Sequence, residues 1–314
     1  MSAPLDYFCV RERAIAGTLL DPGVVGIGWN PGGLWRPVRI DSTGPGRIDR
    51  LRVLCRDAND ARAHLRLHAR LDNDLPRSVV VRTSVDGEPV AEQSFSLAHG
   101  LNEIDWNLDV NDPRLWWPWT MGDQHLTDVQ VEVVVDGTTS DQRAVRTGLR
   151  EVAMTDWVIS VNGEPLFVKG INVGPTRHDL AHASADEVRR DVELARGMGL
   201  DLVRLNGHIA RSEFYAAADE LGMLVWQDFP LQWGYARSVR REAVRQAREA
   251  VDLLDQHQVA AYDLAFQKKG DQAATDAAGV VRAVKAAGEA ILRLGGAEVG
   301  DKTMVDALVP WLAR

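Results

Sequence analysis

Four side chains of the kinds that bind polyhydroxyl ligands lie at the ends of two successive apolar runs in the second half of the chain. Arg204 and Asn206 lie at the end of the first run, and Trp226 and Asp228 lie at the end of the second. If both runs are strands of one parallel sheet, their carboxyl ends meet at the edge where ligands bind in such folds. The pattern therefore predicts a substrate-binding site formed by these four residues.

Arg204 and Asp228 admit two interpretations. An arginine and a carboxylate on adjacent strands can bind a polyhydroxyl ligand through charge-assisted hydrogen bonds. They can equally pair with each other in a salt bridge that holds the end of the sheet together. The spacing in the sequence favours neither interpretation over the other.

Two pairs of histidines have the four-residue spacing that metal ligands use on a helix. His178 and His182 flank Asp179 in a predicted loop, whereas His64 and His68 lie in a strand-like run and share one strand face. Neither pair has a third ligand at a supporting spacing. The sequence therefore predicts no metal site and no cofactor.

Alternating strands and helices must position the four site residues. A capping box of Ser184 and Glu187 begins a helix that Gly199 ends, and Gly222 ends the next helix. This alternation predicts a parallel sheet or the opening of a (β/α)₈ barrel. The expected strands span 166–173, 201–206 and 224–229, and the expected helices span 184–199, 212–221 and 238–257.

Residues 47–148 have the period-two pattern of strands. Apolar residues alternate with arginines and histidines over 63–71, which predicts one buried and one solvent-exposed face. The Asp-Gly pairs at 86–87 and 136–137 lie between strand-like runs and supply the positive φ that tight hairpins need. Six or seven short strands over about 100 residues predict an antiparallel, immunoglobulin-like sandwich.

Residues 113–119 read Pro-Arg-Leu-Trp-Trp-Pro-Trp, a composition that fits poorly inside a central strand. An aromatic cluster of this kind either stacks on sugar faces or builds a structural corner at the edge of the sandwich. Both interpretations remain open, and we favour a structural corner.

The overall composition limits the possible partners and compartments. The chain has 314 residues, a net charge of -9 and no basic cluster, which argues against binding to nucleic acid. It contains no uncharged apolar run of about 18 residues, and residues 1–17 lack the pattern of a secretory signal. Cys9 and Cys55 cannot build a disulfide framework. We expect a cytoplasmic protein without a membrane span; the oligomeric state cannot be predicted.

The last part of the chain differs in composition from the rest. Residues 1–257 contain 28 Arg and a single Lys, whereas residues 258–314 contain 3 Arg and 4 Lys. Apolar residues recur at helical spacing over 275–294, and a Gly-Gly pair follows them. These features predict a helical tail of separate origin.

Seven segments of the chain carry recognisable motifs, at 26–38, 115–126, 162–172, 204–207, 214–215, 219–222 and 225–229. Together they resemble glycoside hydrolase family 2, most closely its β-mannosidase-like branch. In chain order, they resemble the end of the family's jelly-roll domain, its immunoglobulin-like spacer and the first three units of its TIM barrel.

The resemblance implies a multidomain β plus α/β fold with four parts. They are a remnant of the jelly-roll domain at 1–46, an immunoglobulin-like β-sandwich at 47–150, a partial (β/α)₈ TIM barrel at 151–257 and the helical tail at 258–314.

The resemblance also implies that the catalytic residues are missing. The family has His-Pro-Ser before a fourth strand that ends in Asn-Glu, whose glutamate is the acid/base, and a second glutamate later acts as nucleophile. This chain has His257-Gln258-Val259 instead, and no Asn-Glu pair follows residue 228. Retaining hydrolysis needs two carboxyl groups about 5 to 5.5 Å apart. We therefore expect a truncated family 2 protein with no catalytic residue and no hydrolase activity.

The tail carries a second resemblance. Residues 295–310 are similar to a segment of the nucleotide-binding helical domain of dihydroxyacetone kinases. The resemblance implies that Lys302 and Thr303 contact a nucleotide phosphate at a helix start. The clustered aspartates that hold Mg²⁺ in that family have no counterpart in this chain.

Three functions are compatible with these features. The first is a family 2 glycosidase that acts on a β-linked mannoside or a related β-glycoside. The second is a non-catalytic β-sandwich module that binds carbohydrate or protein. The third is a fusion product of a glycosidase and a dihydroxyacetone kinase. We favour a family 2 protein that has lost hydrolysis.

Overall fold

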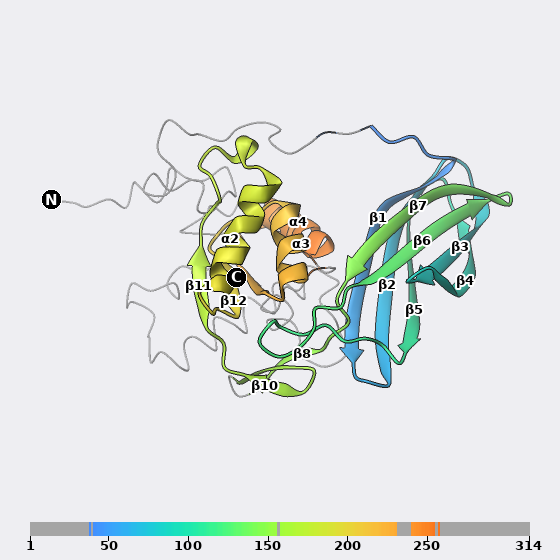
Figure 1. Cartoon of the computed structure of the whole chain (residues 1–314). Helices are drawn as coiled ribbons and strands as arrows, with labels where there is room; N and C mark the ends of the chain where they lie inside the picture. The colour runs from blue at the N-terminus through green and yellow to red at the C-terminus, as the bar shows by residue number, and fades with distance from the viewer. Residues whose placement is uncertain (1–37, 39, 156–157, 231–239, 255–256, 258–314) are drawn as a thin grey trace.

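The computed structural model describes residues 38, 40–155, 158–230, 240–254 and 257. Most of the predicted jelly-roll segment and all of the predicted helical tail lie outside these residues. Figure 1 shows two parts side by side, an all-β part over 46–147 and a part over 152–254 that contains both strands and helices. No helix in the described ranges is both long enough and apolar enough to cross a membrane.

Seven antiparallel strands form a β-sandwich, as the period-two pattern predicts. One sheet has the order β1-β2-β5 and the other has the order β4-β3-β6-β7. The strands are β1 (Gly46–Ala58), β2 (Arg62–Asn73), β3 (Arg77–Val85), β4 (Glu88–Leu97), β5 (Gly100–Asn111), β6 (Thr127–Val135) and β7 (Thr138–Thr147).

The two faces of β2 follow the predicted alternation. The predicted apolar face is completely buried in the core that the two sheets share, and its residues are Leu65, Leu67, Ala69 and Leu71. The arginines and histidines between them are only partly exposed, which corrects the expected solvent-exposed face. Aspartates of the neighbouring strands pair with these side chains and cover them.

Tight hairpin turns join several of the strands. Each turn has two consecutive residues with positive φ, a conformation in which glycine and short polar residues are favoured. The predicted Asp-Gly turns are therefore confirmed. The φ values are 49° and 87° for Asp86-Gly87, 50° and 79° for Asp136-Gly137, and 50° and 84° for Asn162-Gly163.

A small sheet connects the sandwich to the rest of the chain. It contains β8 (Val152–Thr155), β9 (Val158–Val161) and β10 (Glu164–Leu166) in the order β10-β9-β8. The prediction of one strand over 166–173 is wrong, because β10 ends at Leu166 and the next strand begins at Gly170. The hairpin at Asn162-Gly163 pairs 164–166 with β9, so the chain must turn before it joins another sheet.

Three parallel strands form the second sheet, in the order β11-β12-β13. The predicted capping box of Ser184 and Glu187 is confirmed, and Gly222 ends a helix in the left-handed conformation. The elements are β11 (Gly170–Val173), η3 (Leu180–His182), α2 (Ala185–Gly197), β12 (Leu202–Leu205), α3 (Ser212–Leu221), β13 (Leu224–Gln227) and α4 (Arg240–Leu254). Residues of α2 and α3 form a buried core with one face of this sheet.

The tryptophan run joins the sandwich to the α/β part. Trp116 is completely buried and donates its indole N–H to the carbonyl oxygen of Asp219 in α3, at 2.8 Å. Trp119 donates its indole N–H to the carbonyl oxygen of Leu200, also at 2.8 Å. Gly222 must stay small here, because a Cβ atom would lie 2.5 Å from the backbone nitrogen of Trp119. The run is therefore a structural corner.

Candidate functional site

The parallel sheet places Asn172, Arg204 and Trp226 in one row. Asn172 and Trp226 are the register partners of Arg204 on the two neighbouring strands. Val203 and Val225 pack into the core formed with α2 and α3, so alternation along each strand directs Arg204 and Trp226 to the opposite face. The side chain of Trp226 is still 37% exposed. The row thus lies on the face of the sheet that these two helices leave uncovered.

Arg204 and Asp228 form a bidentate ion pair at the carboxyl end of this row. Nε of Arg204 lies 3.0 Å from Oδ1 of Asp228, and Nη2 lies 2.8 Å from Oδ2. The structure therefore contains the salt bridge that the second interpretation of the sequence predicts. A guanidinium group has more N–H donors than this pair uses, and the Arg204 side chain is 38% exposed. The pair can accept a ligand without breaking.

Asn206 and His208 lie in the segment that follows β12. The backbone N–H of Asn206 donates to the carbonyl oxygen of Val173 at 3.4 Å. Its own carbonyl oxygen accepts a hydrogen bond from Nδ1 of His208 at 3.2 Å. His208 is buried, and this burial lowers the pKa of its imidazole, although the Asn206 carbonyl and the charge of Asp228 act in the opposite direction. Burial therefore favours the neutral form of the imidazole.

Gln227 and Tyr215 also belong to this cluster, although the sequence prediction did not include either of them among the site residues. Nε2 of Gln227 donates to the carbonyl oxygens of His208 and Asp228, at 2.7 Å each. The hydroxyl of Tyr215 donates to Oε1 of Gln227 at 2.5 Å. The sequence does contain a signal for Gln227. A polar residue between Trp226 and Asp228 points toward the helix-covered face of the strand, so it needs a buried hydrogen-bond partner there.

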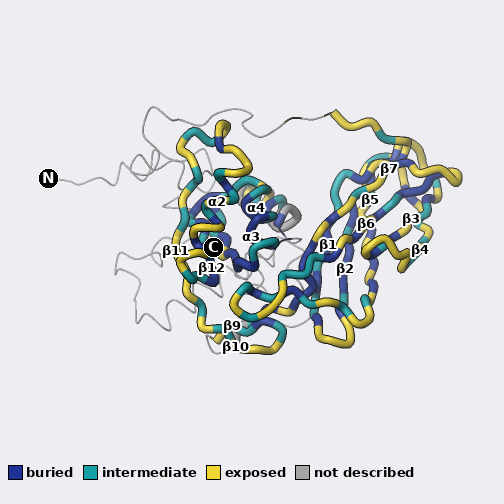
Figure 2. The backbone as a smooth tube through the Cα atoms, in the orientation of Figure 1, coloured by how far each residue is buried: buried dark blue, intermediate teal, exposed yellow. Residues whose placement is uncertain are grey.

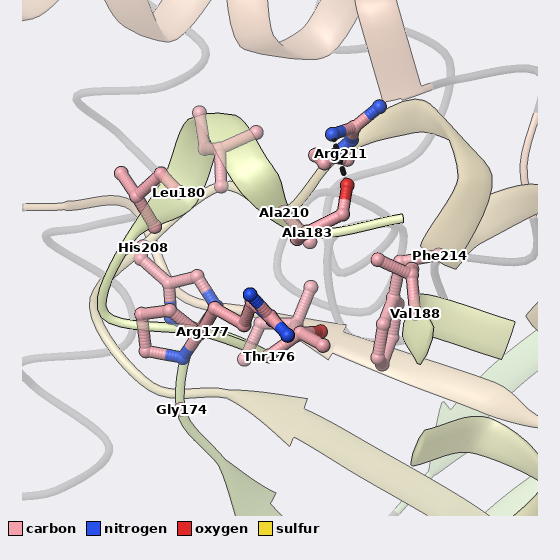
Figure 3. Close-up of a pocket in the computed structure, with 13 residues that line it drawn as sticks. Gly174, Thr176, Arg177, Leu180, Ala183, Val188, His208, Ala210, Arg211 and Phe214 are labelled. Atoms are coloured by element: carbon pink, nitrogen blue, oxygen red, sulfur yellow. Dashed lines mark hydrogen bonds between the residues drawn. The ribbon is translucent and has the colours of Figure 1, made fainter. Parts of the chain in front are cut away.

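A small cavity lies beside the cluster, between the loop after β11 and the start of α3 (Figure 3). Its volume is about 30 Å³, and its wall includes His208, Arg177 and Arg211. Both arginines are paired with carboxylates, Arg177 with Glu187 and Arg211 with Glu213. A space of this size holds on the order of one or two water molecules. A sugar would therefore have to lie over the uncovered face of the sheet.

A larger hollow of about 330 Å³ lies at one end of the sandwich, where β3 and β5 end. Its lining includes Asp86, Asp109, Arg114 and His125. Burial lowers the pKa of His125, and the positive charge of Arg114 lowers it further. None of the four predicted substrate-binding residues lines this hollow, so the larger of these two spaces does not coincide with the predicted site.

The histidine pairs contact carboxylates. Nδ1 of His64 lies 2.7 Å from Oδ1 of Asp109, across the strand pair β2 and β5. Nδ1 of His182 lies 2.7 Å from Oδ2 of Asp179. In the part of the chain that the structure describes, no group of three or more His, Cys, Asp or Glu side chains could hold a metal ion.

Two family models match separate parts of the chain. Residues 46–150 match the model of glycosyl hydrolases family 2, which coincides with the β-sandwich. Residues 260–314 match the DAK2 domain model. Lys302 and Thr303 fall inside the second match but outside the described residues, so the nucleotide-binding prediction for them stays a prediction.

Curated relatives are similar to a longer part of the chain. An exo-β-D-glucosaminidase of Amycolatopsis orientalis is 32% identical over 207 residues, which cover 61% of this chain and 19% of that protein. A β-mannosidase B of Aspergillus clavatus is 28% identical over 244 residues, which cover 70% of this chain and 29% of that protein. The chain thus spans less than a third of the length of either relative.

Solved structures show the same similarity. A β-D-mannosidase from Dictyoglomus thermophilum has a TM-score of 0.65 at 24% identity, covering 74% of this chain and 31% of that chain. An exo-chitosanase of Amycolatopsis orientalis has a TM-score of 0.63 at 25% identity, covering 69% of this chain and 28% of that chain. Together these matches support a protein similar to family 2 glycosyl hydrolases, with a β-sandwich as its first described part.

Proposed function

We propose that this chain binds a β-glycoside at the carboxyl ends of β11, β12 and β13, through Arg204, Asn206, Trp226 and Asp228. The observation that carries the proposal is the bidentate Arg204–Asp228 pair beside a partly exposed tryptophan. Charged donors and acceptors suit sugar hydroxyls, and an aromatic face suits the C–H surface of a sugar ring. The glycosidases among the similar proteins support a β-glycoside as the ligand class.

We propose further that the 314 residues bind this ligand without hydrolysing it. Of the described residues that directly follow β11, β12 and β13, Asp228 is the one carboxylate, and it is paired with Arg204. Double displacement needs a second carboxyl group about 5 to 5.5 Å away. The absence of an Asn-Glu pair after residue 228 supports the same conclusion.

The proposed domain arrangement follows from the order of the elements. Residues 47–150 form the sandwich, and residues 151–257 correspond to the first three units of a TIM barrel. Two features support a barrel segment: the strands are parallel, and α2 and α3 cover only one face. In such a barrel the row containing Arg204 and Trp226 faces the interior, where active sites of this fold lie at the carboxyl ends of the strands.

Calorimetric titration of the full chain tests the binding site. The probes are methyl β-D-mannoside and methyl β-D-glucosaminide. Arg204→Met removes the charged hydrogen bonds, so its affinity should fall by about tenfold or more. Arg66→Met is the matched control, because Arg66 forms a comparable pair with Asp105 on the sandwich, far from the strand ends. Equal affinity in the wild type and Arg204→Met, or no binding of either probe to the wild type, contradicts the proposed function.

Hydrolysis is tested separately with 4-nitrophenyl β-D-mannoside and 4-nitrophenyl β-D-glucosaminide. We expect no release of nitrophenol above the buffer blank. Turnover that persists through repeated purification and disappears in Asp228→Asn would make Asp228 catalytic and overturn this part of the proposal.

Nucleotide binding by the tail is a second proposed function, which the DAK2 match favours. We propose that Lys302 and Thr303 contact a phosphate only weakly, since no cluster of aspartates that suits Mg²⁺ accompanies them in the sequence. Thermal unfolding of the full chain and of a variant ending at His257 tests this, with and without Mg-ATP. Because the proposed contact is weak, we expect Mg-ATP to leave the melting temperature of both proteins unchanged. A rise of several degrees in the full chain that Lys302→Ala abolishes, and Lys285→Ala does not, would show a tight nucleotide site and contradict this expectation.

A further inference from the structure

A chain of buried polar contacts runs beneath the carboxyl ends of the parallel strands. Its members are Gln227 at the end of β13, Tyr215 and Asp219 in α3, and His257 after α4, all of them buried. Figure 2 shows α3, which carries Tyr215 and Asp219, as mostly buried or intermediate, in contrast to the exposed loops around it. Buried polar groups of this kind must satisfy one another, so their arrangement is specified by the fold.

Gln227 connects the two segments that carry the proposed site residues. Its two N–H groups donate to the carbonyl oxygens of His208 and Asp228, at 2.7 Å each. One carbonyl belongs to the segment after β12, and the other belongs to the residue that pairs with Arg204. The planar carboxamide therefore sets the spacing between these two segments.

The hydroxyl of Tyr215 determines which way this carboxamide points. It accepts a hydrogen bond from the backbone N–H of Ala210 at 3.1 Å, so its own proton is available for Oε1 of Gln227 at 2.5 Å. A hydroxyl that donates its proton requires the oxygen of the amide to face it. The nitrogen of Gln227 must then face the two carbonyl groups at the strand ends.

The ring of Tyr215 is held in place from the other side. It stacks on the imidazole of His257, with 5.4 Å between ring centroids and 27° between the ring planes. Nδ1 of His257 lies 2.6 Å from Oδ2 of Asp219, one helical turn from Tyr215 along α3. The position of the hydroxyl is therefore defined by packing as well as by hydrogen bonds.

We propose that Tyr215 is a positioning residue of the glycoside site. Its hydroxyl orients the carboxamide of Gln227, which holds the backbone of Asp228 and keeps its carboxylate opposite Arg204. The effect on ligand binding rests on the proposed function, whereas the effect on the Arg204–Asp228 pair does not.

Tyr215→Phe tests this proposal in the full chain. The substitution keeps the ring on His257 and removes only the hydroxyl. Thr83→Val is the matched control, because it deletes a buried hydroxyl that accepts the indole N–H of Trp106 at 3.1 Å, in the core of the sandwich. Urea unfolding of both variants establishes how much stability each has lost, and the comparison is made between variants that are folded.

The decisive readout is the NMR signal of the Arg204 Nε–H group, assigned by its loss in Arg204→Lys. In the wild type this group donates to Asp228. We expect Tyr215→Phe to shift the signal and to speed its exchange with water severalfold, and to weaken binding of methyl β-D-mannoside about five- to tenfold. Thr83→Val should change neither. Gln227→Glu keeps an oxygen for Tyr215 but loses both donors, so it should have the same effects.

The outcomes separate the two proposals. If the Arg204 signal and its exchange are unchanged in folded Tyr215→Phe, or in folded Gln227→Glu where Tyr215→Phe does not fold, Tyr215 has no positioning role. If Thr83→Val changes the signal equally, the effect reflects general destabilisation and the proposal is wrong. If the wild type binds no glycoside, the proposed function fails, and the Arg204 signal still decides the role of Tyr215.

Discussion

The indole N–H of Trp116 donates to the main-chain carbonyl oxygen of Asp219 at 2.8 Å, across the boundary between the sandwich and α3. Trp116 is completely buried in a cluster that also contains Val152, Leu202 and Leu224. The sandwich edge, the small connecting sheet and the parallel sheet therefore share one apolar contact, and the hydrogen bond fixes its geometry.

Trp116→Phe should destabilise the full chain. It removes a buried hydrogen bond and leaves the Asp219 carbonyl without this donor, and it also leaves a small cavity. We expect the free energy of unfolding to fall by about 1 to 3 kcal/mol, measured by urea denaturation. Trp226→Phe is the control and should change it by roughly 0.5 kcal/mol or less, because Trp226 is partly exposed. Equal effects of the two substitutions would contradict the importance of the Trp116 contact.

Glu220 connects three elements electrostatically. It pairs with Arg189 of α2 and with Arg146 of β7, and the hydrogen bond from Arg189 is the main reason that the pKa of its carboxyl is lowered. Because this group is about a third exposed, Glu220→Gln should cost only about 0.5 to 1 kcal/mol at neutral pH. Thermal unfolding of Glu92→Gln, whose partner Arg82 lies on the same sheet, provides the comparison and should show a smaller loss.

Glu213 should contribute to the acid sensitivity of the fold. Hydrogen bonds from Arg211 lower its pKa from 4.5 to about 2. A carboxyl group whose pKa is lowered by folding stabilises the native state above its unfolded pKa, and this contribution is lost as the pH falls through the folded value. Between pH 4.5 and about 2, the melting temperature of the wild type should therefore fall more steeply than that of Glu213→Gln. Parallel curves for the two proteins would rule out this contribution.

The sandwich should fold without the rest of the chain. The buried residues of its core all lie between Ile48 and Leu149. In contrast, the apolar cluster that contains Leu202 and Leu224 of the parallel sheet also contains Trp116, which lies between two strands of the sandwich. We expect a fragment of residues 46–150 to unfold cooperatively in urea, and a fragment of residues 151–257 not to. Limited trypsin digestion of the full chain gives an independent check. A resistant fragment within 157–257, with degradation of 46–150, would reverse the assignment.

Local sequence was sufficient for the features that depend on neighbouring residues. The Asp-Gly and Asn-Gly turns, the capping box of Ser184 and Glu187 and the stop at Gly222 all follow from backbone conformations that few residue types adopt. The buried face of β2 follows from its period of two. The parallel arrangement of β11, β12 and β13 could also be predicted, because strands that alternate with helices form parallel sheets.

Only the tertiary structure decided how distant residues meet. The register of β12 and β13 brings Arg204 and Asp228 into a bidentate pair, and the sequence could not choose between this pair and free side chains. The split of 166–173 depends on the hairpin that pairs 164–166 with β9. The hydrogen bond from the hydroxyl of Tyr215 to Gln227 forms because α3 packs on the face of β13 opposite Trp226. Propensities act along the chain, whereas these contacts depend on which surfaces become buried together.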